Sequence, residues 1–115
     1  METTNAPGFG PPLHTHPETE VFRVLGGRYL YEVDGRRFYA ETGDVITVPG
    51  GMPHAFVNVT DAPARQLILI MPGLDVVAFF SGLRDLTKDG KVDVAALNAY
   101  GKTWGSKFLG PPLTP

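Results

Sequence analysis

The distribution of apolar and polar residues along the chain predicts a series of short β-strands. Six runs rich in β-branched and aromatic residues occur at 20–25, 28–33, 36–41, 45–48, 54–59 and 65–71. The Asp34-Gly35 pair between the second and third runs is a strong signal for a two-residue hairpin turn. Six short strands joined by turns of this length are typical of an antiparallel sandwich or barrel.

A helical pattern follows the last of these runs. Within residues 74–86, apolar residues lie three positions apart, at Val77, Phe80 and Leu83. This spacing predicts an amphipathic helix packed against the barrel. Asp93 is suited to cap a second short helix over residues 94–100, with Gly101 ending it. The Pro-rich tail, KFLGPPLTP, is expected to be extended.

The length of 115 residues suits one compact domain, residues 1–115. We expect residues 1–13 to be a flexible lead or an edge strand, residues 14–71 to form the barrel, and residues 74–115 to form the helices and the tail. Hydrophobic residues make up 43% of the chain and charged residues 19%, which is ordinary for a globular protein. The 14 glycines and 11 prolines favour short strands and turns over long helices.

Charge and cysteine content exclude several classes of function. The net charge of -2 offers no basic patch for nucleic acid and no polybasic stretch for a membrane surface. No apolar run approaches the length of a membrane-spanning helix, and the N-terminus lacks the apolar segment of a signal peptide. A cytoplasmic location is therefore the default expectation. Because cysteine is absent, a metal site must use nitrogen and oxygen ligands.

The three histidines of the chain have a spacing that favours a shared site. His14 and His16 lie two positions apart, so on an extended segment both imidazoles point to the same side. Glu20 follows across a short turn at the start of a predicted strand, and His54 begins a later strand. Three imidazoles and one carboxylate on a β-scaffold are typical ligands for Mn, Fe, Co, Ni, Cu or Zn. Taken alone, a His-x-His pair is more often a solvent-exposed feature than a metal site.

Two motifs surround these residues. The pattern G-x5-H-x-H-x3-E-x6-G is matched by Gly8, His14, His16, Glu20 and Gly27. The pattern G-x5-P-x-G-x2-H-x3-N is matched by Gly43, Pro49, Gly51, His54 and Asn58. With both motifs complete and in this order, the chain resembles the cupin superfamily. The FLGPPL stretch near residues 108–113 is similar to the tails of small single-domain cupins described as quercetin-dioxygenase-like.

This resemblance implies an all-β fold, a six- to eight-stranded antiparallel jelly-roll barrel with one or two short C-terminal helices. It also implies that His14, His16, Glu20 and His54 bind one divalent transition-metal ion. Such cupins usually have about two strands before the first motif, whereas only thirteen residues precede His14 here. Either the domain is a trimmed one, or the N-terminal edge of the barrel is completed by the C-terminal tail or by a partner subunit, and we expect a homodimer.

The alternation of side chains predicts what surrounds the metal. Inward-facing residues that would line a substrate pocket are Phe22, Val24, Tyr29, Tyr31, Phe38, Phe56 and Asn58. An apolar and aromatic lining favours a planar or aromatic small molecule over a sugar or a phosphate. The simpler alternative is that these side chains fill the core of the barrel.

Three functions remain open at this stage. The first is a metal-dependent dioxygenase acting on a small aromatic or enolisable substrate, with Glu20 as the base that removes the substrate proton. The second is a metal-assisted isomerase, cyclase or decarboxylase of the kind that acts on polyketides. The third is a non-enzymatic module that binds a small molecule.

Overall fold

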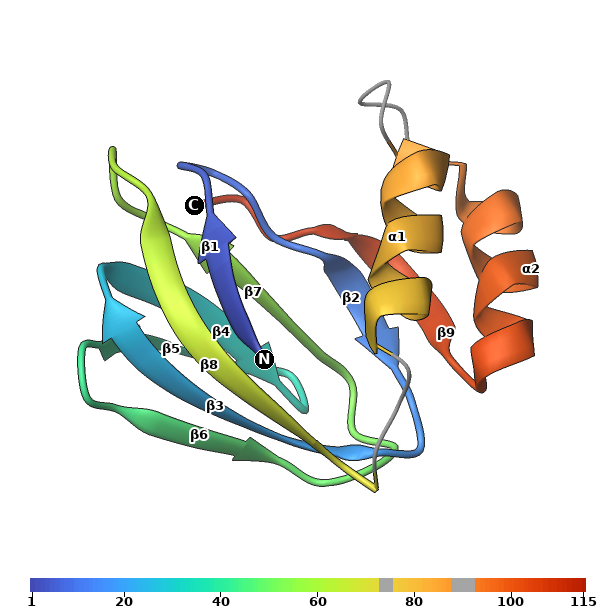
Figure 1. The fold of residues 1–115 in the computed structure, drawn as a ribbon, viewed down its shortest axis with the longest axis horizontal. Helices are drawn as coiled ribbons and strands as arrows, with labels where there is room; N and C mark the ends of the chain where they lie inside the picture. The colour runs from blue at the N-terminus through green and yellow to red at the C-terminus, as the bar shows by residue number, and fades with distance from the viewer. Residues whose placement is uncertain (73–75, 88–92) are drawn as a thin grey trace.

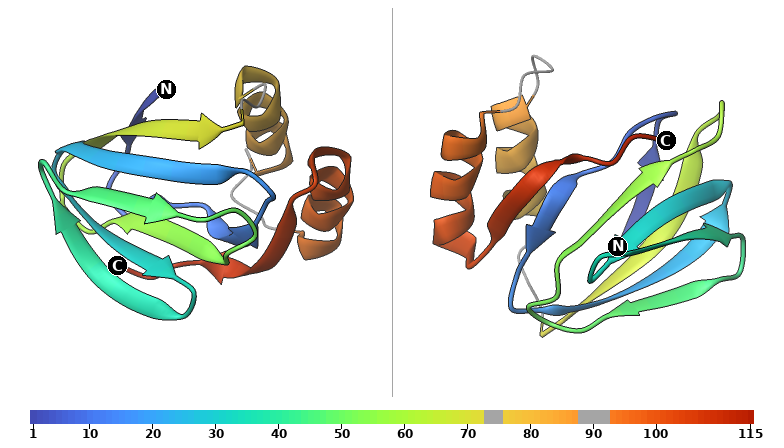
Figure 2. Two further views of the ribbon diagram at one scale, coloured as in Figure 1. Left: turned by 90° about the horizontal axis from the view of Figure 1, so that it is seen from below. Right: turned by 180° about the vertical axis from the view of Figure 1, so that it is seen from behind.

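The computed structural model describes residues 1–72, 76–87 and 93–115, which form two β-sheets with a pair of helices to one side (Figures 1 and 2). The first sheet has the order β1 (Glu2–Asn5), β8 (Ala64–Met71), β3 (Thr19–Gly26) and β6 (Val45–Val48). The second sheet has the order β5 (Arg36–Glu41), β4 (Arg28–Val33), β7 (His54–Asn58), β2 (Pro12–Thr15) and β9 (Lys107–Pro112). All neighbouring strands are antiparallel. The predicted all-β jelly-roll fold is confirmed.

The predicted hairpin at Asp34-Gly35 has the expected geometry. Both residues have positive φ angles, 51° and 78°, as a turn of type I′ requires. The turn sets the register of β4 with β5, which runs from Val33 opposite Arg36 to Arg28 opposite Glu41.

The main hydrophobic core lies between the two sheets. Its largest members are Phe22 and Ile68 from the first sheet and Tyr29, Tyr31 and Phe56 from the second, all at most 8% exposed. The ring of Phe22 lies 5.5 Å from that of Tyr31 and 5.8 Å from that of Phe56. Full burial of an aromatic or large aliphatic side chain stabilises a fold by about 1.5–3 kcal/mol. This cluster is therefore the principal link between the sheets.

A second, smaller core covers the outer face of the second sheet. Leu30, Ala55 and Val57 pack there against Leu113 of the C-terminal tail. As a result every residue of β7 is buried, on both faces of the strand. The tail also forms β9, which pairs with β2. Of the two ways in which the N-terminal edge was expected to be completed, the structure shows the C-terminal tail beside β2.

The N-terminal segment, residues 1–13, contains β1 and the first residues of β2. β1 pairs with β8 at the edge of the first sheet, with Glu2 opposite Leu67 and Asn5 opposite Ala64. The connection to β2 passes so close to β7 that a Cβ atom on Gly10 would overlap the carbonyl oxygen of Phe56. These residues thus belong to the two sheets.

The two helices form a separate layer at one side of the sheets (Figure 1). α1 (Val76–Thr87) packs mainly against α2 (Val94–Trp104), and α2 packs against β9. This corrects the expectation that the first helix lies on the barrel: Phe80, on the predicted apolar stripe, is 36% exposed. Gly82 allows the approach of α2, because a Cβ atom there would overlap the ring of Tyr100. Residues 74 and 75 of the predicted helix, and the side chain of Val77, lie outside the described part.

The second helix begins as predicted and ends later. Asp93 caps it, its side chain accepting hydrogen bonds from the amides of Ala95 and Ala96. The end of the helix is Gly105, with a φ of 74°, and not Gly101. Gly101 lies inside the helix because the returning chain passes over it, where a Cβ atom would overlap the carbonyl oxygen of Ser106. Neither of the helices in the described residues has the length and apolar character needed to cross a bilayer.

Candidate metal centre

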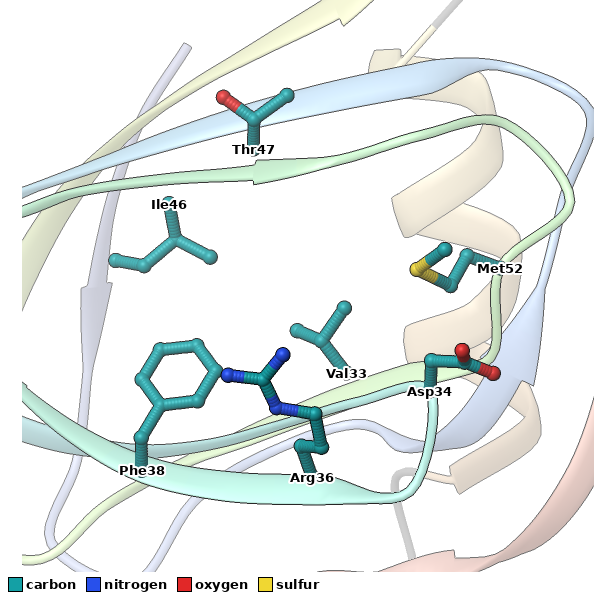
Figure 3. Close-up of a pocket in the computed structure, with 7 residues that line it drawn as sticks. All are labelled: Val33, Asp34, Arg36, Phe38, Ile46, Thr47 and Met52. Carbon is teal, nitrogen blue, oxygen red and sulfur yellow. The ribbon is translucent and has the colours of Figure 1, made fainter.

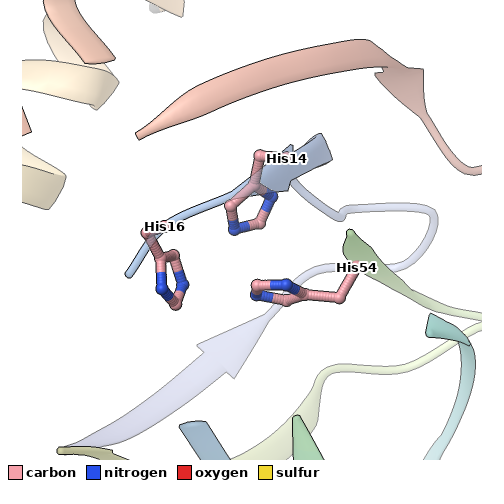
Figure 4. A group of neighbouring side chains, drawn as sticks. All are labelled: His14, His16 and His54. Carbon is pink, nitrogen blue, oxygen red and sulfur yellow. The ribbon is translucent and has the colours of Figure 1, made fainter. Parts of the chain in front are cut away.

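The three histidines meet at one end of the second sheet (Figure 4). His14 on β2 and His54 on β7 are direct cross-strand partners, and their ring centroids are 4.3 Å apart. His16 follows β2, with its ring 4.8 Å from that of His54. One ligand atom from each of the three residues can be chosen so that all lie within 4.8 Å of one another. The histidine triad is therefore positioned to bind a metal ion.

Hydrogen bonds to the main chain fix how each imidazole is presented. Each Nδ1 atom donates to a carbonyl two residues away: His14 to Pro12 at 2.6 Å, His16 to Glu18 at 3.0 Å, and His54 to Met52 at 2.9 Å. Because a carbonyl oxygen only accepts, Nδ1 carries a proton in every case, and Nε2 has a free lone pair whenever the ring is neutral. Hydrogen bonds of this kind, from the far nitrogen of the ring to a carbonyl, orient histidines that ligate metals.

Glu20 reaches the same point from the opposite sheet. It lies on β3 and is 5% exposed. Its Oε1 atom is 3.3 Å from Nε2 of His16, and its Oε2 atom is 3.0 Å from Nε2 of His54. When two neighbouring ligand atoms each bind one ion at about 2.1 Å, they lie roughly 3 Å from each other. The distances from the Glu20 oxygens to the two Nε2 atoms are close to this separation. The structure thus brings together the three histidines that the sequence indicated and places Glu20 against two of them.

The charge state of Glu20 follows from these contacts. Burial alone would raise the pKa of its carboxyl group. Hydrogen bonds with His16 and His54, together with their charges, outweigh burial and lower the pKa to about 2. Glu20 is therefore ionised at neutral pH, as a metal ligand must be.

The histidines differ from one another in proton affinity. Burial would lower the pKa of His16, but the hydrogen bond and charge of Glu20 prevail, so the pKa of His16 is raised. Burial, reinforced by the neighbouring His54, lowers the pKa of His14 to about 3. Without a metal, a proton therefore binds His16 in preference to His14.

This donor set fits a divalent transition-metal ion. Since the Nδ1 atoms of His16 and His54 donate to carbonyls, their Nε2 lone pairs face the oxygens of Glu20. Lone pairs at such distances need a cation between them, either a proton or a metal ion. Imidazole and carboxylate ligands suit the first-row divalent ions Mn to Zn.

The aromatic residues predicted to line a pocket lie behind the four ligands, inside the barrel. The ring of Phe22 is 6.4 Å from that of His54. The hydroxyl of Tyr29 donates to Asn5 Oδ1 at 2.7 Å, and that of Tyr31 donates to Gln66 Oε1. Burial raises the pKa of Tyr29 to about 12 and raises that of Tyr31 as well, so both stay neutral.

The other predicted pocket residues belong to the core as well. Val24 and Phe56 are buried in it, while Phe38 is partly buried at its margin. Contact of these residues with a substrate stays a prediction.

Asn58 is occupied by the main chain around it. Its amide nitrogen donates to the carbonyl oxygens of Asn5 and Ala62, at 3.0 and 2.8 Å. Its side-chain oxygen accepts from the amide and the hydroxyl of Thr60. Asn58 is fully buried and holds the N-terminal segment to the turn after β7.

An open cavity of about 270 Å³ lies beside the turn between β4 and β5, close to the corner that precedes His54 (Figure 3). Its lining consists of Val33, Asp34, Arg36, Phe38, Ile46, Thr47 and Met52. Of these, the sequence analysis singled out only Phe38. Arg36 was missed although it lies two positions before Phe38, which was assigned to the inner face. The same alternation places Arg36 on that face.

Comparison with known protein families gives one match. The model that describes a cupin domain matches residues 1–70. This range contains all four residues of the candidate centre.

Two curated proteins are similar in sequence. An uncharacterized protein of Methanocaldococcus jannaschii is 33% identical over 61 residues, which is 52% of this chain and 49% of that protein. Quercetin 2,3-dioxygenase of Bacillus subtilis is 39% identical over 46 residues, or 39% of this chain and 14% of the dioxygenase. The chain therefore spans about half of the first relative's length and a small part of the second's.

Solved structures share the fold. A cupin 2 conserved barrel domain protein from Salinispora arenicola superposes with a TM-score of 0.57 and 30% identity, over 70% of this chain and 67% of the other. A predicted oxalate decarboxylase from Thermotoga maritima superposes with a TM-score of 0.57 and 26% identity, over 60% of this chain and 61% of the other. A sugar phosphate isomerase of the cupin superfamily from Silicibacter pomeroyi superposes with a TM-score of 0.58 and 29% identity, over 63% of this chain and 48% of the other.

Proposed function

The chain belongs to the cupin domain family, and from this premise we propose that it is a metal-dependent enzyme whose ion is held by His14, His16, Glu20 and His54. The observation that carries the proposal is the convergence of the three histidines, with the carboxylate of Glu20 against two of them. Four protein ligands would leave two positions of an octahedral ion for a small molecule, the feature that separates a reactive site from a closed structural one.

The reaction we favour is that of a dioxygenase acting on a small aromatic or enolisable substrate. The similarity to quercetin 2,3-dioxygenase of Bacillus subtilis supports this choice. When bound, a redox-active ion such as Fe, Mn, Cu, Co or Ni would supply the chemistry with dioxygen and would hold the deprotonated oxygen of the substrate.

The residues of the chain would contribute charge, orientation and shelter from water. The carbonyls that accept from Nδ1 of the histidines hold the imidazoles in one tautomer. The wall formed by Phe22, Tyr31 and Phe56 keeps water from the inner side of the site. Glu20 would act as the base for the substrate proton only if it moves away from its histidine partners, because their contacts make it a weak base in this arrangement.

A second candidate is an isomerase, cyclase or decarboxylase in which the ion serves only to polarise a carbonyl group. The structural similarity to a predicted oxalate decarboxylase and to a sugar phosphate isomerase favours it. The four ligands suit this chemistry equally well, since zinc accepts them as readily as iron does.

Metal content and oxygen consumption test the proposal. Protein purified without added metal is expected to contain close to one equivalent of a first-row divalent ion by elemental analysis. The metal-loaded protein should then consume dioxygen with a member of a panel of flavonols and β-diketones. Full activity with zinc and no oxygen uptake would favour the second candidate. Tight binding of a small molecule without turnover would instead indicate a non-enzymatic binding module. Protein that takes up no divalent metal would refute the metal-dependent function altogether.

A further inference from the structure

The cavity beside the turn between β4 and β5 has one cationic group, and four of its seven lining residues are apolar. It lies between the hairpin of β4 and β5 on one side and β6 with the corner before β7 on the other (Figure 3). Val33, Phe38, Ile46 and Met52 supply apolar surface, and Arg36 supplies the charge. Met52 also accepts the hydrogen bond from His54, so the cavity adjoins the candidate metal centre.

The register of the second sheet places Arg36 in the same row as the histidines. Arg36 pairs with Val33, Val33 pairs with His54, and His54 pairs with His14. Neighbouring strands are about 4.8 Å apart, so the Cα atom of Arg36 lies about 10 Å from that of His54. A small molecule between them could contact the guanidinium at one end and the metal centre at the other.

The main chain fixes the backbone position of Arg36, whose side chain is exposed to solvent at the rim of the cavity. It is the first residue of β5, directly after the hairpin turn. The amide of Asp34 in that turn donates to the carbonyl of Pro53 at 2.9 Å, and Pro53 directly precedes His54. This hydrogen bond ties the turn to the corner that positions His54.

Within the described part of the chain, the guanidinium of Arg36 has no carboxylate partner. Three other arginines do pair with carboxylates: Arg28 with Glu41, Arg37 with Glu32, and Arg65 with Glu2. Asp34 lines the same cavity, but it forms no ion pair with Arg36, and Figure 3 shows its carboxylate turned away from the guanidinium. The guanidinium instead points into the space beside Phe38 and Val33 (Figure 3).

We propose that this cavity binds a small monocarboxylate with an apolar body, whose carboxylate pairs with Arg36 while its other end faces the metal centre. The planar guanidinium matches a carboxylate with two parallel hydrogen bonds. The apolar body packs on Phe38 and Ile46. The proposal rests on the proposed function, because it names the substrate class of the same site.

The lining argues for this class over two others. A sugar needs several hydrogen-bonding groups around it, whereas most of the cavity wall is apolar. A phosphate ester carries close to two negative charges, but the cavity offers one cation and also contains the carboxylate of Asp34. One guanidinium next to apolar surface is complementary to a single negative charge on an apolar molecule.

Binding of matched probes to the metal-loaded protein tests the assignment. We would measure dissociation constants by calorimetry for phenylacetate, for its neutral analogue phenylacetamide, and for phenyl phosphate. Phenylacetate is expected to bind at least tenfold more tightly than either. Comparable affinity for phenylacetamide, or tighter binding of phenyl phosphate, would overturn the assignment.

Two variants locate the carboxylate. Arg36→Met is expected to weaken phenylacetate binding about tenfold or more. Arg36→Lys keeps the positive charge but cannot form the two parallel hydrogen bonds, and should lose less affinity. Arg37→Met is the matched control, because Arg37 is the next residue, faces outward and pairs with Glu32. Its binding should stay within about twofold of the unaltered protein.

The same experiment separates failure of this inference from failure of the proposed function. Metal content is measured for every sample by elemental analysis. If Arg36→Met keeps both its metal and its affinity for phenylacetate, the carboxylate binds the ion itself and the role of Arg36 is refuted, while the metal-dependent function stands. If the unaltered protein takes up no metal, the function fails. The preference for phenylacetate over phenylacetamide, and its loss in Arg36→Met, then decide the role of Arg36 alone.

Discussion

Glu20 and His54 are 34 positions apart in the chain and belong to different sheets, yet Oε2 of Glu20 lies 3.0 Å from Nε2 of His54. The contact joins the two sheets at one end of the barrel, as the aromatic core joins them further inside. A cation held there would bind both sheets at once. Metal binding is therefore expected to stabilise the whole fold.

Glu20→Gln should weaken metal binding at least tenfold. The amide keeps the shape of the side chain but removes the negative charge and leaves a poorer ligand. Titration with zinc or manganese, followed by calorimetry, measures the change. Glu41→Gln is the matched control, because Glu41 is exposed and pairs with Arg28 far from the site. Equal affinities in the two variants would exclude Glu20 as a ligand.

His54→Ala should abolish stoichiometric metal binding. His54 contacts both other histidine rings and Glu20, so its loss removes the residue that lies next to each of the other three proposed ligands. Elemental analysis after dialysis against metal gives the readout, with Lys107→Ala, an exposed site on β9, for comparison. Circular dichroism verifies that the variant is folded. A folded His54→Ala protein with a full equivalent of metal would disprove the assignment.

Metal affinity should fall as the pH decreases, starting above pH 6.5. The pKa of His16 is raised above its ordinary value of 6.5, so below that raised pKa a proton competes with the metal. The affinity should then drop about tenfold per pH unit. His14, with a pKa of about 3, adds no competition in this range. Titrations between pH 5.5 and 8.5 measure the slope, and an affinity independent of pH would contradict it.

The metal-free protein should lose stability in acid through Glu20. Its pKa falls from 4.5 to about 2 on folding, so its contribution to stability is complete above pH 4.5 and is lost as the pH falls toward 2. Urea unfolding of the metal-free protein and of Glu20→Gln, at pH 6 and pH 3, isolates this contribution. The difference in free energy of unfolding between the two should shrink at pH 3. A constant difference would show that ionisation of Glu20 does not support the fold.

Asn58→Ala should lower the free energy of unfolding by about 2–4 kcal/mol. The substitution leaves the buried carbonyl of Asn5 and the amide of Thr60 without their partner. Asn98→Ala, which removes one hydrogen bond to the amide of Phe108 in a less buried place, should cost about 1 kcal/mol. Urea denaturation measures both. Equal costs would mean that the hydrogen bonds of Asn58 are not what holds the N-terminal segment.

We also propose that the chain forms a homodimer through the outer face of the first sheet. Val45, Leu69 and Met71 lie on that face and are 50–60% exposed. Apolar side chains gathered on one surface are typical of an interface. Light scattering of the unaltered protein should give twice the mass of one chain. The Leu69→Glu variant should give the mass of one chain. A monomer at high concentration would refute this proposal.

The strands were predictable from the sequence because their period and turns are local properties. The Asp34-Gly35 turn and the alternation in residues 28–33 required no knowledge of distant contacts. The end of α2 did not follow from such rules, since Gly101 and Gly105 both suit a helix end. The choice depends on where Ser106 passes over the helix. In the same way, the partner of α1 was decided by the fit of Tyr100 against Gly82, a contact between two helices.

The residues of the candidate metal centre were predictable because their chemistry is rare in this chain. Only three histidines exist, and both motifs place them next to predicted turns. Arg36 was harder to find, because an exposed arginine after a turn is ordinary, and only the folded arrangement of β6 and Met52 places a cavity next to it. The carbonyl partners of the imidazoles also depend on folded geometry.

The pairing of β2 with β9 has a consequence for how the protein is made. β2 meets β7 at a single partner pair, His14 with His54, and is otherwise held by β9. During synthesis on the ribosome, His14 and His54 emerge long before residues 107–112. The strand that carries His14 is secured only after that last strand has appeared, so the nascent protein should acquire its ion late, after translation has passed β9.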